Sequence, residues 1–501
     1  MSKYIVTVTP PTPNGDLHIG HIAGPFLSAD VFTRVQRQRG HECVLISYSD
    51  DYQSYMQRKG IETGIEPTVL AQSNTEKIKQ SLAAMKISID NWMSPYKNTF
   101  FKDAVSELFK FVQERGAIQF HESSEPYCES CKVWGYEAFG RGLCNYCGVD
   151  SDASQCEGCA HAPDANLMKD FHCKLCRKLP KFNPVKRAFL HLERFAPLLQ
   201  NVHSKYEKRH PMDSWLDTAI NQLKPWGITR PEEAGLDLEE DGSCRVHTWF
   251  MGMAGYIAAF REYAAQRNEA DLFSRFWYSG DGEIVHFLGF DCLFSHAIAY
   301  PVLLEQCPEI NVRQSFIPNQ FLKLDGLNLS TSRNHAIWAR ELVEKVGSDS
   351  ARLYLASIAP EEEEGDFRSD EFESWHQAIF EDLVPRIFHE VEAETMNWSW
   401  SRELTGPDAG LLNGLRQKWL SAGDASNFSM KALAATILDA FALCRVRLGQ
   451  GEPVTHLAAF IAVAGQALIP DLSHRLIAQF RLYENAILCW LVDGSPADYS
   501  I

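Results

Sequence analysis

The sequence has 501 residues, too many for one compact domain, so about two to four domains are expected. Its 45% hydrophobic and 23% charged residues are typical of soluble globular proteins, and the absence of an apolar run of about 18 residues excludes a transmembrane helix. The net charge of −17 disfavours a large nucleic-acid surface. The N-terminus lacks the apolar core of a signal peptide, so a cytoplasmic protein without a membrane partner is expected.

The N-terminal segment predicts a βαβ unit. Residues 3–9 alternate and are β-branched, as in a buried strand, and residues 10–16 form a loop rich in Pro, Asn and Gly. Residues 18–38 have the apolar spacing of a helix, and residues 43–48 form a second strand. Such a unit predicts a parallel sheet with a right-handed crossover. Asp50 follows the second strand, at the edge of the sheet where ligands bind.

The rest of the chain divides by composition. Residues 285–290 predict another strand and residues 293–304 the helix that follows it, and the pattern is helical from about 371 to the end. The acidic run 361–364 predicts a solvated link. The predicted class is α/β, with a Rossmann-type parallel-sheet catalytic domain, a Cys-rich insertion and an α-helical C-terminal domain. The predicted boundaries are 1–119 and 181–370 for the two halves of the sheet domain, 120–180 for the insertion and 371–501 for the helical domain.

Four Cys-x-x-Cys pairs stand in the insertion: Cys128 with Cys131, Cys144 with Cys147, Cys156 with Cys159, and Cys173 with Cys176. Two such knuckles complete a tetrahedral thiolate site, so the eight cysteines predict two structural Zn²⁺ sites that the insertion needs in order to fold. We favour a nested pairing, with the inner four around one ion and the outer four around the other, and sequential pairing is the alternative. Redox pairs and a nucleic-acid-binding ribbon are further alternatives to a structural zinc knob.

A phosphate site is predicted where the first helix begins. His18-Ile19-Gly20-His21 places a helix N-terminus, with its free N–H groups and positive dipole, directly after the first strand and loop. The two histidines can point the same way and donate to phosphate oxygens, and Gly15 and Gly20 let the backbone and a base lie close. A lone His-x-x-His is more often structural or metal-binding.

The run from Pro11 to His21, with Asn14, Gly15 and the tetrapeptide at 18–21, resembles the HIGH signature of class I aminoacyl-tRNA synthetases, in particular the methionyl-tRNA synthetase subgroup. Segments 49–51, 249–256 and 286–291 agree with that family in order, and the four knuckles resemble the two-zinc insertion of some members. The resemblance covers residues 3–360 well and the helical tail loosely.

The resemblance implies a ligase that uses ATP, with Mg²⁺, to convert an amino acid into an aminoacyl adenylate. It implies catalytic roles for His18, His21, Ser330 and Ser332. It implies ATP contacts from Asn14, Gly15, His18, Gly20, His21, Gly289, Asp291 and Leu329. It implies amino-acid contacts from Pro10, Thr12, Asp50, Trp249, Tyr256, Cys292 and His296. Within these sets Gly20 would leave space for adenine, Asp291 would hold the ribose hydroxyls, and Asp50 would hold the α-ammonium. The alternative for Asp50 is a turn residue at a strand end.

Three departures from the family pattern carry the functional prediction. The second signature, Lys-Met-Ser-Lys-Ser, is replaced by residues 328–332, Asn-Leu-Ser-Thr-Ser, which lack both cations, although the flanking Lys323 and Arg333 could substitute. In the amino-acid pocket Thr12 replaces a Tyr and Cys292 an aliphatic residue, which disfavours methionine. Pro385 and His389 stand where an Asn and an Arg read the anticodon, and Pro385 would kink its helix.

These departures predict an enzyme that activates a small amino acid outside translation and passes the acyl group to a small molecule or a protein rather than to tRNA. By analogy with specialised metabolism, hydrazine-type N–N bond pathways and a separate cupin-type partner protein are included in the prediction. A genuine divergent methionine--tRNA ligase is one alternative. A catalytically silent nucleotide-binding or regulatory paralogue is the other.

Overall fold

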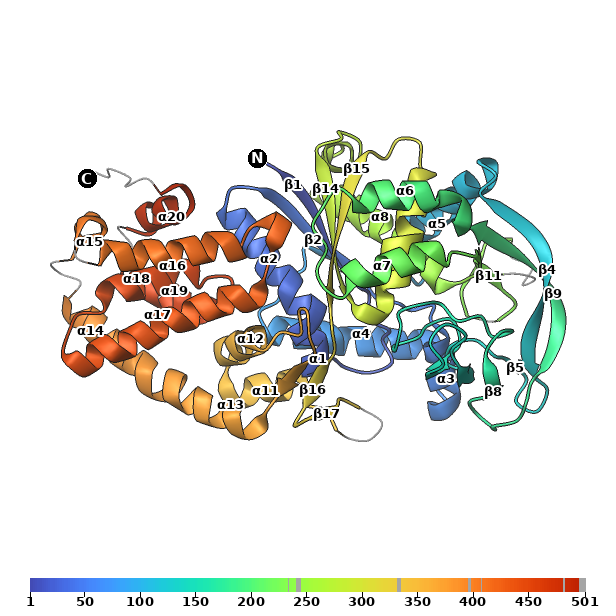
Figure 1. Cartoon of the computed structure of the whole chain (residues 1–501), viewed down its shortest axis with the longest axis horizontal. Coiled ribbons are helices and arrows are strands. Elements are labelled where there is room, and N and C mark those ends of the chain that lie inside the picture. Colours follow the sequence, from blue (N-terminus) through green and yellow to red (C-terminus); the bar gives the residue numbers. More distant parts are fainter. Residues whose placement is uncertain are drawn as a thin grey trace.

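A five-stranded parallel sheet in the order β15-β14-β1-β2-β3 stands at the centre of the computed structural model (Figure 1). The strands are β1 (Lys3–Val8), β2 (Glu42–Tyr48), β3 (Asn91–Met93), β14 (Gly282–Gly289) and β15 (Val312–Asn319). The strands predicted at 3–9, 43–48 and 285–290 are confirmed as β1, β2 and β14, which lie side by side. The structure describes residues 1–232, 234–239, 245–330, 335–394, 398–406, 408–480 and 483–494.

The two faces of the sheet are buried in two different hydrophobic cores. Successive side chains of a strand point to opposite faces, so Val6 of β1 joins one core and Ile5 joins the other. Helices α2 (Leu27–Gln38), α12 (Ser348–Ser357) and α17 (Met430–Gln450) contribute to the first core, and α5 (Thr99–Glu114) and α8 (Thr248–Arg267) contribute to the second. This double burial explains why the strands are apolar on both faces.

The helix predicted over 18–38 is not continuous. The structure has α1 (Ile19–His21), a π-helical segment η1 (Ile22–Phe26) and then α2. Pro25 lies inside η1 and Gly24 has the non-helical angles φ −84° and ψ −117°. Because proline lacks an N–H group and clashes with the carbonyl four residues before it, the regular hydrogen-bond ladder cannot pass this point. The helix predicted over 293–304 is confirmed, although its first part, η4 (Phe294–Ala299), is π-helical and precedes α10 (Tyr300–Glu305), which contains Pro301.

The Cys-rich insertion is a small unit of short strands carried on a long ribbon. Strands β4 (Ile118–Cys128) and β9 (Lys181–His191) pair antiparallel along the ribbon, at the right of Figure 1. The short strands are β5 (Val133–Trp134), β6 (Gly140–Leu143), β7 (Asp150–Asp152) and β8 (Lys169–Cys173). The unit's own hydrophobic core consists only of Ala153, Ala165, Met168 and Phe171. So small a core agrees with the prediction that metal sites hold the insertion together.

Helices and short strands complete the sheet domain. After β2 come α3 (Ser54–Thr63) and α4 (Pro67–Ala84). After the insertion come η2 (Leu192–Phe195), α6 (Ala196–His203), α7 (Met212–Asn221), β10 (Pro225–Gly227), β11 (Thr229–Arg230), β12 (Leu236–Asp237), β13 (Arg245–Val246) and α9 (Leu272–Trp277). After β14 come η3 (Phe290–Cys292), β16 (Leu322–Leu324), β17 (Leu327–Asn328), α11 (Ala339–Val346) and β18 (Gly365–Phe367).

The C-terminal part is helical, as predicted, and lies on the opposite side of the sheet from the insertion (Figure 1). Its helices are α13 (Ser369–His376), η6 (Gln377–Leu383), α14 (Val384–Glu394), α15 (Trp400–Thr405), α16 (Ala409–Ala422), η8 (Ala425–Asn427), α17, α18 (Thr455–Ala464), α19 (Pro470–Ile477) and α20 (Glu484–Asp493). Pro385 is the second residue of α14 and comes just after the π-helical η6, where the irregular hydrogen bonding accommodates its missing N–H. None of the described helices combines the length and the apolar character needed to cross a membrane. The domain boundaries stay a prediction.

A buried ion pair joins the two ends of the sheet domain. Arg352 of α12 is fully buried, and its guanidinium donates to Oδ2 of Asp30 on α2 at 2.7 Å. The same guanidinium donates to the carbonyl oxygens of Met85 at 2.8 Å and Leu468 at 3.1 Å. Because every side of this cation has an acceptor, its burial is tolerated and it fixes α12 against α2, α4 and α19.

Candidate active site and metal centres

The two histidines of the first signature stand together where the helix begins after β1. Nδ1 of His18 accepts from the N–H of Gly20 at 3.1 Å, and Nδ1 of His21 accepts from the N–H of His18 at 3.2 Å. The ring centroids lie 3.9 Å apart. The segment is held from outside by a bridge between His18 and Trp338, and the N–H of Ile19 donates to the carbonyl of Ile337 at 3.0 Å.

These contacts decide the protonation of both rings. Burial lowers the pKa of His18 to about 4 and lowers that of His21 well below its usual value. Both imidazoles are therefore neutral at pH 7, and because each Nδ1 accepts a hydrogen bond, the proton of each ring is on Nε2. The pair presents two Nε2–H donors at a helix N-terminus, which suits the oxygens of a phosphate group. The predicted role of the histidines as phosphate donors fits this geometry.

Gly20 and the second signature loop meet directly. A Cβ built on Gly20 would lie 2.8 Å from Cδ1 of Leu329, so the glycine allows Leu329 to approach the first turn. Ser330 and His335 exchange two backbone hydrogen bonds of 2.8 and 2.9 Å, which fold the loop back on itself. Ser332 lies outside the described residues. The structure therefore brings the described part of the lysine-free loop beside the first signature, as the prediction requires.

Of the two cations expected to compensate for the missing lysines, Arg333 lies outside the described residues and Lys323 already has a partner. Nζ of Lys323 lies 2.6 Å from Oε2 of Glu364. The acidic run is thus more than the predicted solvated link, although Glu362, Glu363 and Glu364 are exposed. Glu361 accepts from Oγ of Ser429 at 2.6 Å and from the N–H of Lys431 at 3.0 Å, at the N-terminus of α17. An acid in that place complements the helix dipole.

The loop between β1 and the histidines is tied to both halves of the sheet domain. Asp16 accepts from Nη2 of Arg340 at 2.7 Å, and the N–H of Asp50 donates to the carbonyl of Pro11 at 3.0 Å. The N–H of Asn14 donates to the carbonyl of Thr12 at 2.8 Å, which forms a turn. A Cβ on Gly15 would meet no atom within 4 Å, so this glycine borders open space. Pro10 and Thr12 are half-buried.

Asp50 is a buried carboxylate at the carboxyl end of β2. Its Oδ1 accepts a short hydrogen bond from Oγ1 of Thr248, and its Oδ2 accepts from Nε2 of Gln53 at 3.4 Å. Burial raises the pKa of Asp50 to about 7, and the neighbouring Glu137 and Asp51 add to the rise. No described cation pairs with this carboxylate. A buried acid that lacks a cation suits a ligand that brings its own positive charge, such as an α-ammonium group.

The predicted aromatic wall of the pocket begins on the first turn of α8. Nε1 of Trp249 donates to Oε1 of Glu137 at 2.8 Å, and Glu137 also accepts from Nη1 of Arg230 at 2.9 Å. Glu137 belongs to the Cys-rich insertion and is 2% exposed. The insertion therefore sets the orientation of Trp249.

Tyr256, His296 and Cys292 form a connected group behind Asp50. The hydroxyl of Tyr256 lies 3.0 Å from Nε2 of His296 and 3.3 Å from the carbonyl of Val8. Nδ1 of His296 lies 3.1 Å from the carbonyl of Cys292 and 3.0 Å from Oγ of Ser295. Burial lowers the pKa of His296 to about 3 and raises that of the Cys292 thiol. The group is neutral at pH 7 and lies at the carboxyl ends of β1 and β14, and its role in binding an amino acid stays a prediction.

Asp291 and Gly289 stand at the end of β14, next to β1 in the sheet. A Cβ on Gly289 would lie 2.8 Å from Oδ1 of Asp291, so the glycine allows the carboxylate to fold back over the strand end. Burial raises the pKa of Asp291 to about 6. His18, Asp50 and Asp291 therefore follow three adjacent parallel strands, at the edge where open α/β sheets bind ligands.

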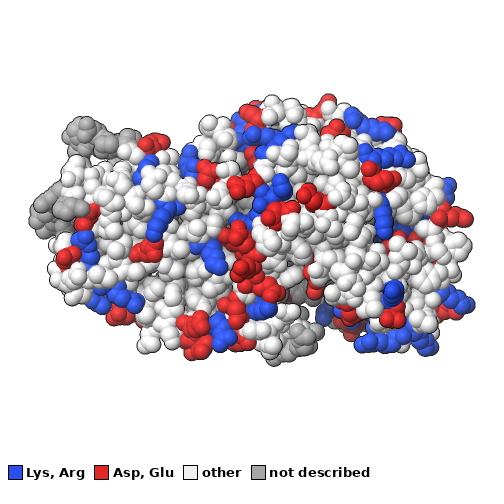
Figure 2. Space-filling view, viewed as in Figure 1, with Lys and Arg blue, Asp and Glu red and all other residues white. Residues whose placement is uncertain are grey.

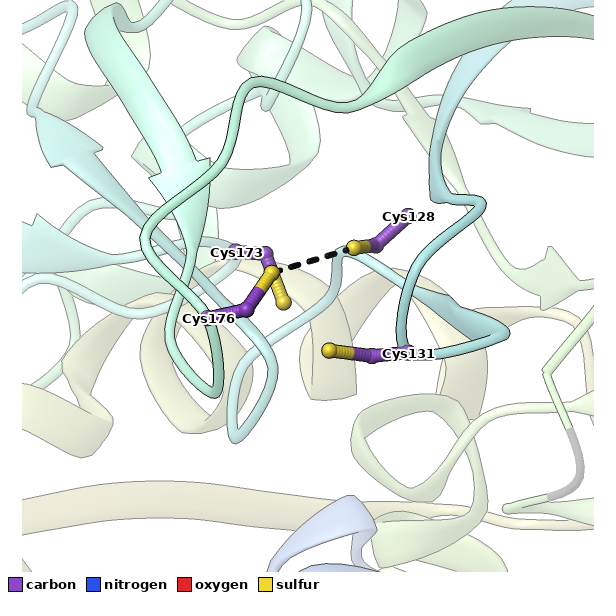
Figure 3. Close-up of side chains that lie close together, drawn as sticks. All are labelled: Cys128, Cys131, Cys173 and Cys176. Atoms are coloured by element: carbon purple, nitrogen blue, oxygen red, sulfur yellow. Dashed lines mark hydrogen bonds between the residues drawn. The ribbon is translucent and has the colours of Figure 1, made fainter.

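The eight insertion cysteines form two compact groups of sulfur atoms. In each group the Sγ atoms all lie within 4.8 Å of one another. The outer group consists of Cys128, Cys131, Cys173 and Cys176 (Figure 3), and the inner group consists of Cys144, Cys147, Cys156 and Cys159. The nested pairing predicted from the sequence is confirmed. Four thiolates in a closed tetrahedral set fit Zn²⁺ in a structural role, since no position is left for a substrate.

All four knuckles share one backbone conformation. The residue four places after the first cysteine of each pair donates its N–H to the carbonyl of that cysteine, at 2.7 to 2.8 Å. The same residue has a positive φ, 55° at Lys132, 74° at Gly148, 54° at Ala160 and 63° at Arg177. Such turns aim both sulfur atoms of a pair to the same side. The repeated strain at three non-glycine positions fits a turn that is fixed by a bound ion.

Several residues of the site escaped the sequence analysis. Thr248 and Gln53 contact Asp50, Glu137 orients Trp249, and Gln155 contacts Asp291. All but Gln53 lie more than 100 positions away from the residue that they contact. Neither spacing nor composition signals such contacts, because they depend on where the insertion and α8 fold against the sheet.

Comparison with known proteins agrees with this arrangement. A family model described as "tRNA synthetases class I (M)" matches residues 4–387, well over half of the chain, and the chain belongs to this family. It is 28% identical over 442 residues to a methionine--tRNA ligase of Thermococcus kodakarensis, covering 84% of this chain and 59% of that protein. It is 29% identical over 405 residues to that of Pyrococcus furiosus, covering 77% of this chain and 55% of that protein. The chain thus spans less than two thirds of the length of these relatives.

A solved structure shares the fold over nearly the whole chain. The structure of a Mycobacterium tuberculosis methionyl-tRNA synthetase in complex with methionyl-adenylate matches with a TM-score of 0.72 and 16% identity. The match covers 95% of this chain and 93% of that chain. It therefore includes the sheet, the insertion and the helical tail in one common arrangement.

Proposed function

We propose that this member of the class I tRNA synthetases activates an amino acid with ATP. A carboxylate oxygen of the amino acid attacks the α-phosphorus, the bond from that phosphorus to the bridging oxygen breaks, and pyrophosphate leaves with the electron pair. The observation that carries the proposal is that three kinds of group follow three adjacent strands. The two Nε2–H donors of the histidines follow β1, Asp50 follows β2 and Asp291 follows β14. Together they match a triphosphate, an ammonium group and a ribose.

Each group has one task in this reaction. His18 and His21 donate to phosphate oxygens as charge builds on them, which lowers the barrier because the donors are already in place. Asp50 is uncharged or charged with nearly equal ease at pH 7, and the ammonium group of the substrate favours its charged form. Asp291 accepts from the ribose hydroxyls. Mg²⁺ would accompany the triphosphate, and Zn²⁺ in the two cysteine groups would hold the insertion in its fold.

We propose further that the acceptor of the acyl group is a small molecule or a protein rather than tRNA. Both lysine positions of the second signature are occupied by uncharged residues, and Lys323 is paired with Glu364. Pro385 and His389 are exposed on α14 and offer neither the amide nor the guanidinium expected there. On the face shown in Figure 2, acidic and basic side chains are interspersed over the described surface instead of forming a basic stripe.

The alternative acceptor is tRNA, with methionine as the amino acid. It is favoured by the likeness to methionine--tRNA ligases and by the retained group of Trp249, Tyr256 and His296. A cupin-type partner and a role in N–N bond formation stay predictions, and so does activation of a small amino acid.

ATP–pyrophosphate exchange with each amino acid in turn tests the first proposal. We expect exchange with one amino acid, and its loss in Asp50→Ala and His21→Ala. Exchange with methionine, followed by charging of transcribed tRNA, would replace the second proposal by the alternative. ATP binding without exchange for any amino acid would refute both proposals and would identify a silent paralogue.

A further inference from the structure

The Cys-rich insertion reaches the nucleotide side of the site through one side chain. Nε2 of Gln155 donates to Oδ2 of Asp291 at 2.8 Å, and the same nitrogen lies 3.9 Å from Sγ of Cys292. Gln155 is 136 positions away from Asp291. Oδ1, the other oxygen of Asp291, lies on the side of Gly289 and has a weak contact of 3.9 Å with Sγ of Cys292. One oxygen of the carboxylate is thus held by the insertion.

The backbone of Gln155 is fixed by its surroundings. Gln155 immediately precedes Cys156, a fully buried member of the inner cysteine group, and forms a backbone bridge with Asp152. Its carbonyl oxygen accepts from Oγ of Ser151 at 3.4 Å. Asp152 in turn accepts from Nζ of Lys174 at 2.6 Å, and from the hydroxyl of Tyr55 on α3. The amide of Gln155 is therefore carried by a segment that the cysteine group and α3 hold in place.

This placement gives the contact a consequence for binding. A carboxylate with two oxygens can accept from a fixed donor on one and from a ligand on the other. The donor restricts rotation of the carboxylate before the ligand arrives, which reduces the entropy lost on binding. A neutral amide also favours the charged form of Asp291 without competing as a cation for the phosphates.

We propose that Gln155 is a positioning residue, which orients Asp291 for the ribose hydroxyls of ATP and so makes nucleotide affinity depend on the Cys-rich insertion. The proposal rests on the proposed function, because it takes ATP as the ligand of Asp291. It assigns to the insertion a direct part in nucleotide selection in addition to its structural role.

Two variants of Gln155 test the proposal. Gln155→Ala removes the donor, and Gln155→Glu keeps the shape but places an acceptor against Asp291. Asn166→Ala is the matched control, since Asn166 is an exposed amide of the same insertion. Calorimetric titration of the chain with ATP and with 2′,3′-dideoxy-ATP measures the preference for the ribose hydroxyls. Zinc content, measured by metal analysis, shows whether the insertion keeps its fold.

We expect the wild-type chain and the control to prefer ATP. In Gln155→Ala the affinity for ATP falls about tenfold, the affinity for the dideoxy nucleotide changes little, and the zinc content is unchanged. Gln155→Glu weakens ATP binding at least as much. If both variants keep the wild-type preference for ATP over the dideoxy nucleotide, the proposal is overturned. It is also overturned if a variant loses affinity for both nucleotides equally and loses zinc as well, because that result would indicate a structural role for Gln155. A wild-type chain that binds neither nucleotide would overturn the proposed function itself.

Discussion

Replacing Asp50 by Asn should make the protein more stable while it abolishes amino-acid binding. Burial raises the pKa of Asp50 from 3.8 to about 7. Between about pH 4 and pH 7, therefore, Asp50 is protonated in the native chain and ionised in the unfolded chain. Because the native state binds more protons, the stability of the wild type falls as the pH rises from about 4 to 7. Above pH 7 the charged carboxylate stays buried without a described cation beside it.

The size of the effect follows from the shift. A displacement of about three pH units corresponds to about 4 kcal/mol, at about 1.4 kcal/mol for each unit. The Asn variant keeps an acceptor for Thr248 but loses the acceptor of the 3.4 Å bond from Gln53, which costs about 1 kcal/mol. Above pH 7 the free energy of unfolding of the Asn variant should therefore exceed that of the wild type by about 3 kcal/mol. At roughly 2 °C for each kcal/mol in a large domain, the midpoint of heat unfolding should rise by about 6 °C.

Heat unfolding followed by circular dichroism at pH 4.5, 6, 7 and 8 measures this gain. The difference in the midpoint of heat unfolding between the Asn variant and the wild type should be small at pH 4.5 and should grow up to pH 8. The other titrating groups are the same in both proteins, so their effects cancel in this difference. Asp103→Asn, which changes an exposed carboxylate on α5, should show no such growth. A difference for Asp50→Asn that is independent of pH, or a destabilised variant at pH 8, would refute the argument from burial.

Four further outcomes are expected. The value of kcat/KM for the amino acid should rise about tenfold for each pH unit below about 7 and then level off, because Asp50 must be charged to hold the ammonium group; a flat profile from pH 5 to 8 would contradict this role. His21→Ala should slow pyrophosphate exchange about 100- to 1000-fold with little change in the KM of the amino acid, and a change confined to KM would count against phosphate stabilisation. The purified chain should hold two zinc ions and Cys131→Ser one, as metal analysis can determine, and retention of both would disprove the outer site. Arg352→Ala should destabilise the protein by about 2–4 kcal/mol in urea unfolding. It removes the donor of the buried carbonyls of Met85 and Leu468 and leaves Asp30 with Arg34 as its ion-pair partner, and a loss under about 1 kcal/mol would refute the importance of Arg352.

The sequence predicted the features that depend on local pattern. Strands β1, β2 and β14 were evident from apolar, β-branched runs, because a strand buried on both faces has little choice of residues. The knuckles were evident from spacing, which favoured the nested zinc pairing but left sequential pairing open until the structure placed the sulfur atoms. The pattern did not show that the helix over 18–38 is interrupted beside Pro25 or that the helix over 293–304 begins as a π-helix, since apolar spacing does not register a missing N–H donor.

By itself the sequence determined that a helix N-terminus with two histidines follows the first strand, that acids follow β2 and β14, and that eight cysteines form two groups. Only the tertiary structure decided that the parallel sheet brings the three strand ends together, that Lys323 is paired with Glu364, and that the insertion contacts the site through Glu137 and Gln155. The physical reason is that spacing along the chain fixes which residues share an element. Contacts between distant elements instead depend on how their apolar faces pack, and that packing leaves no periodic signal in the sequence.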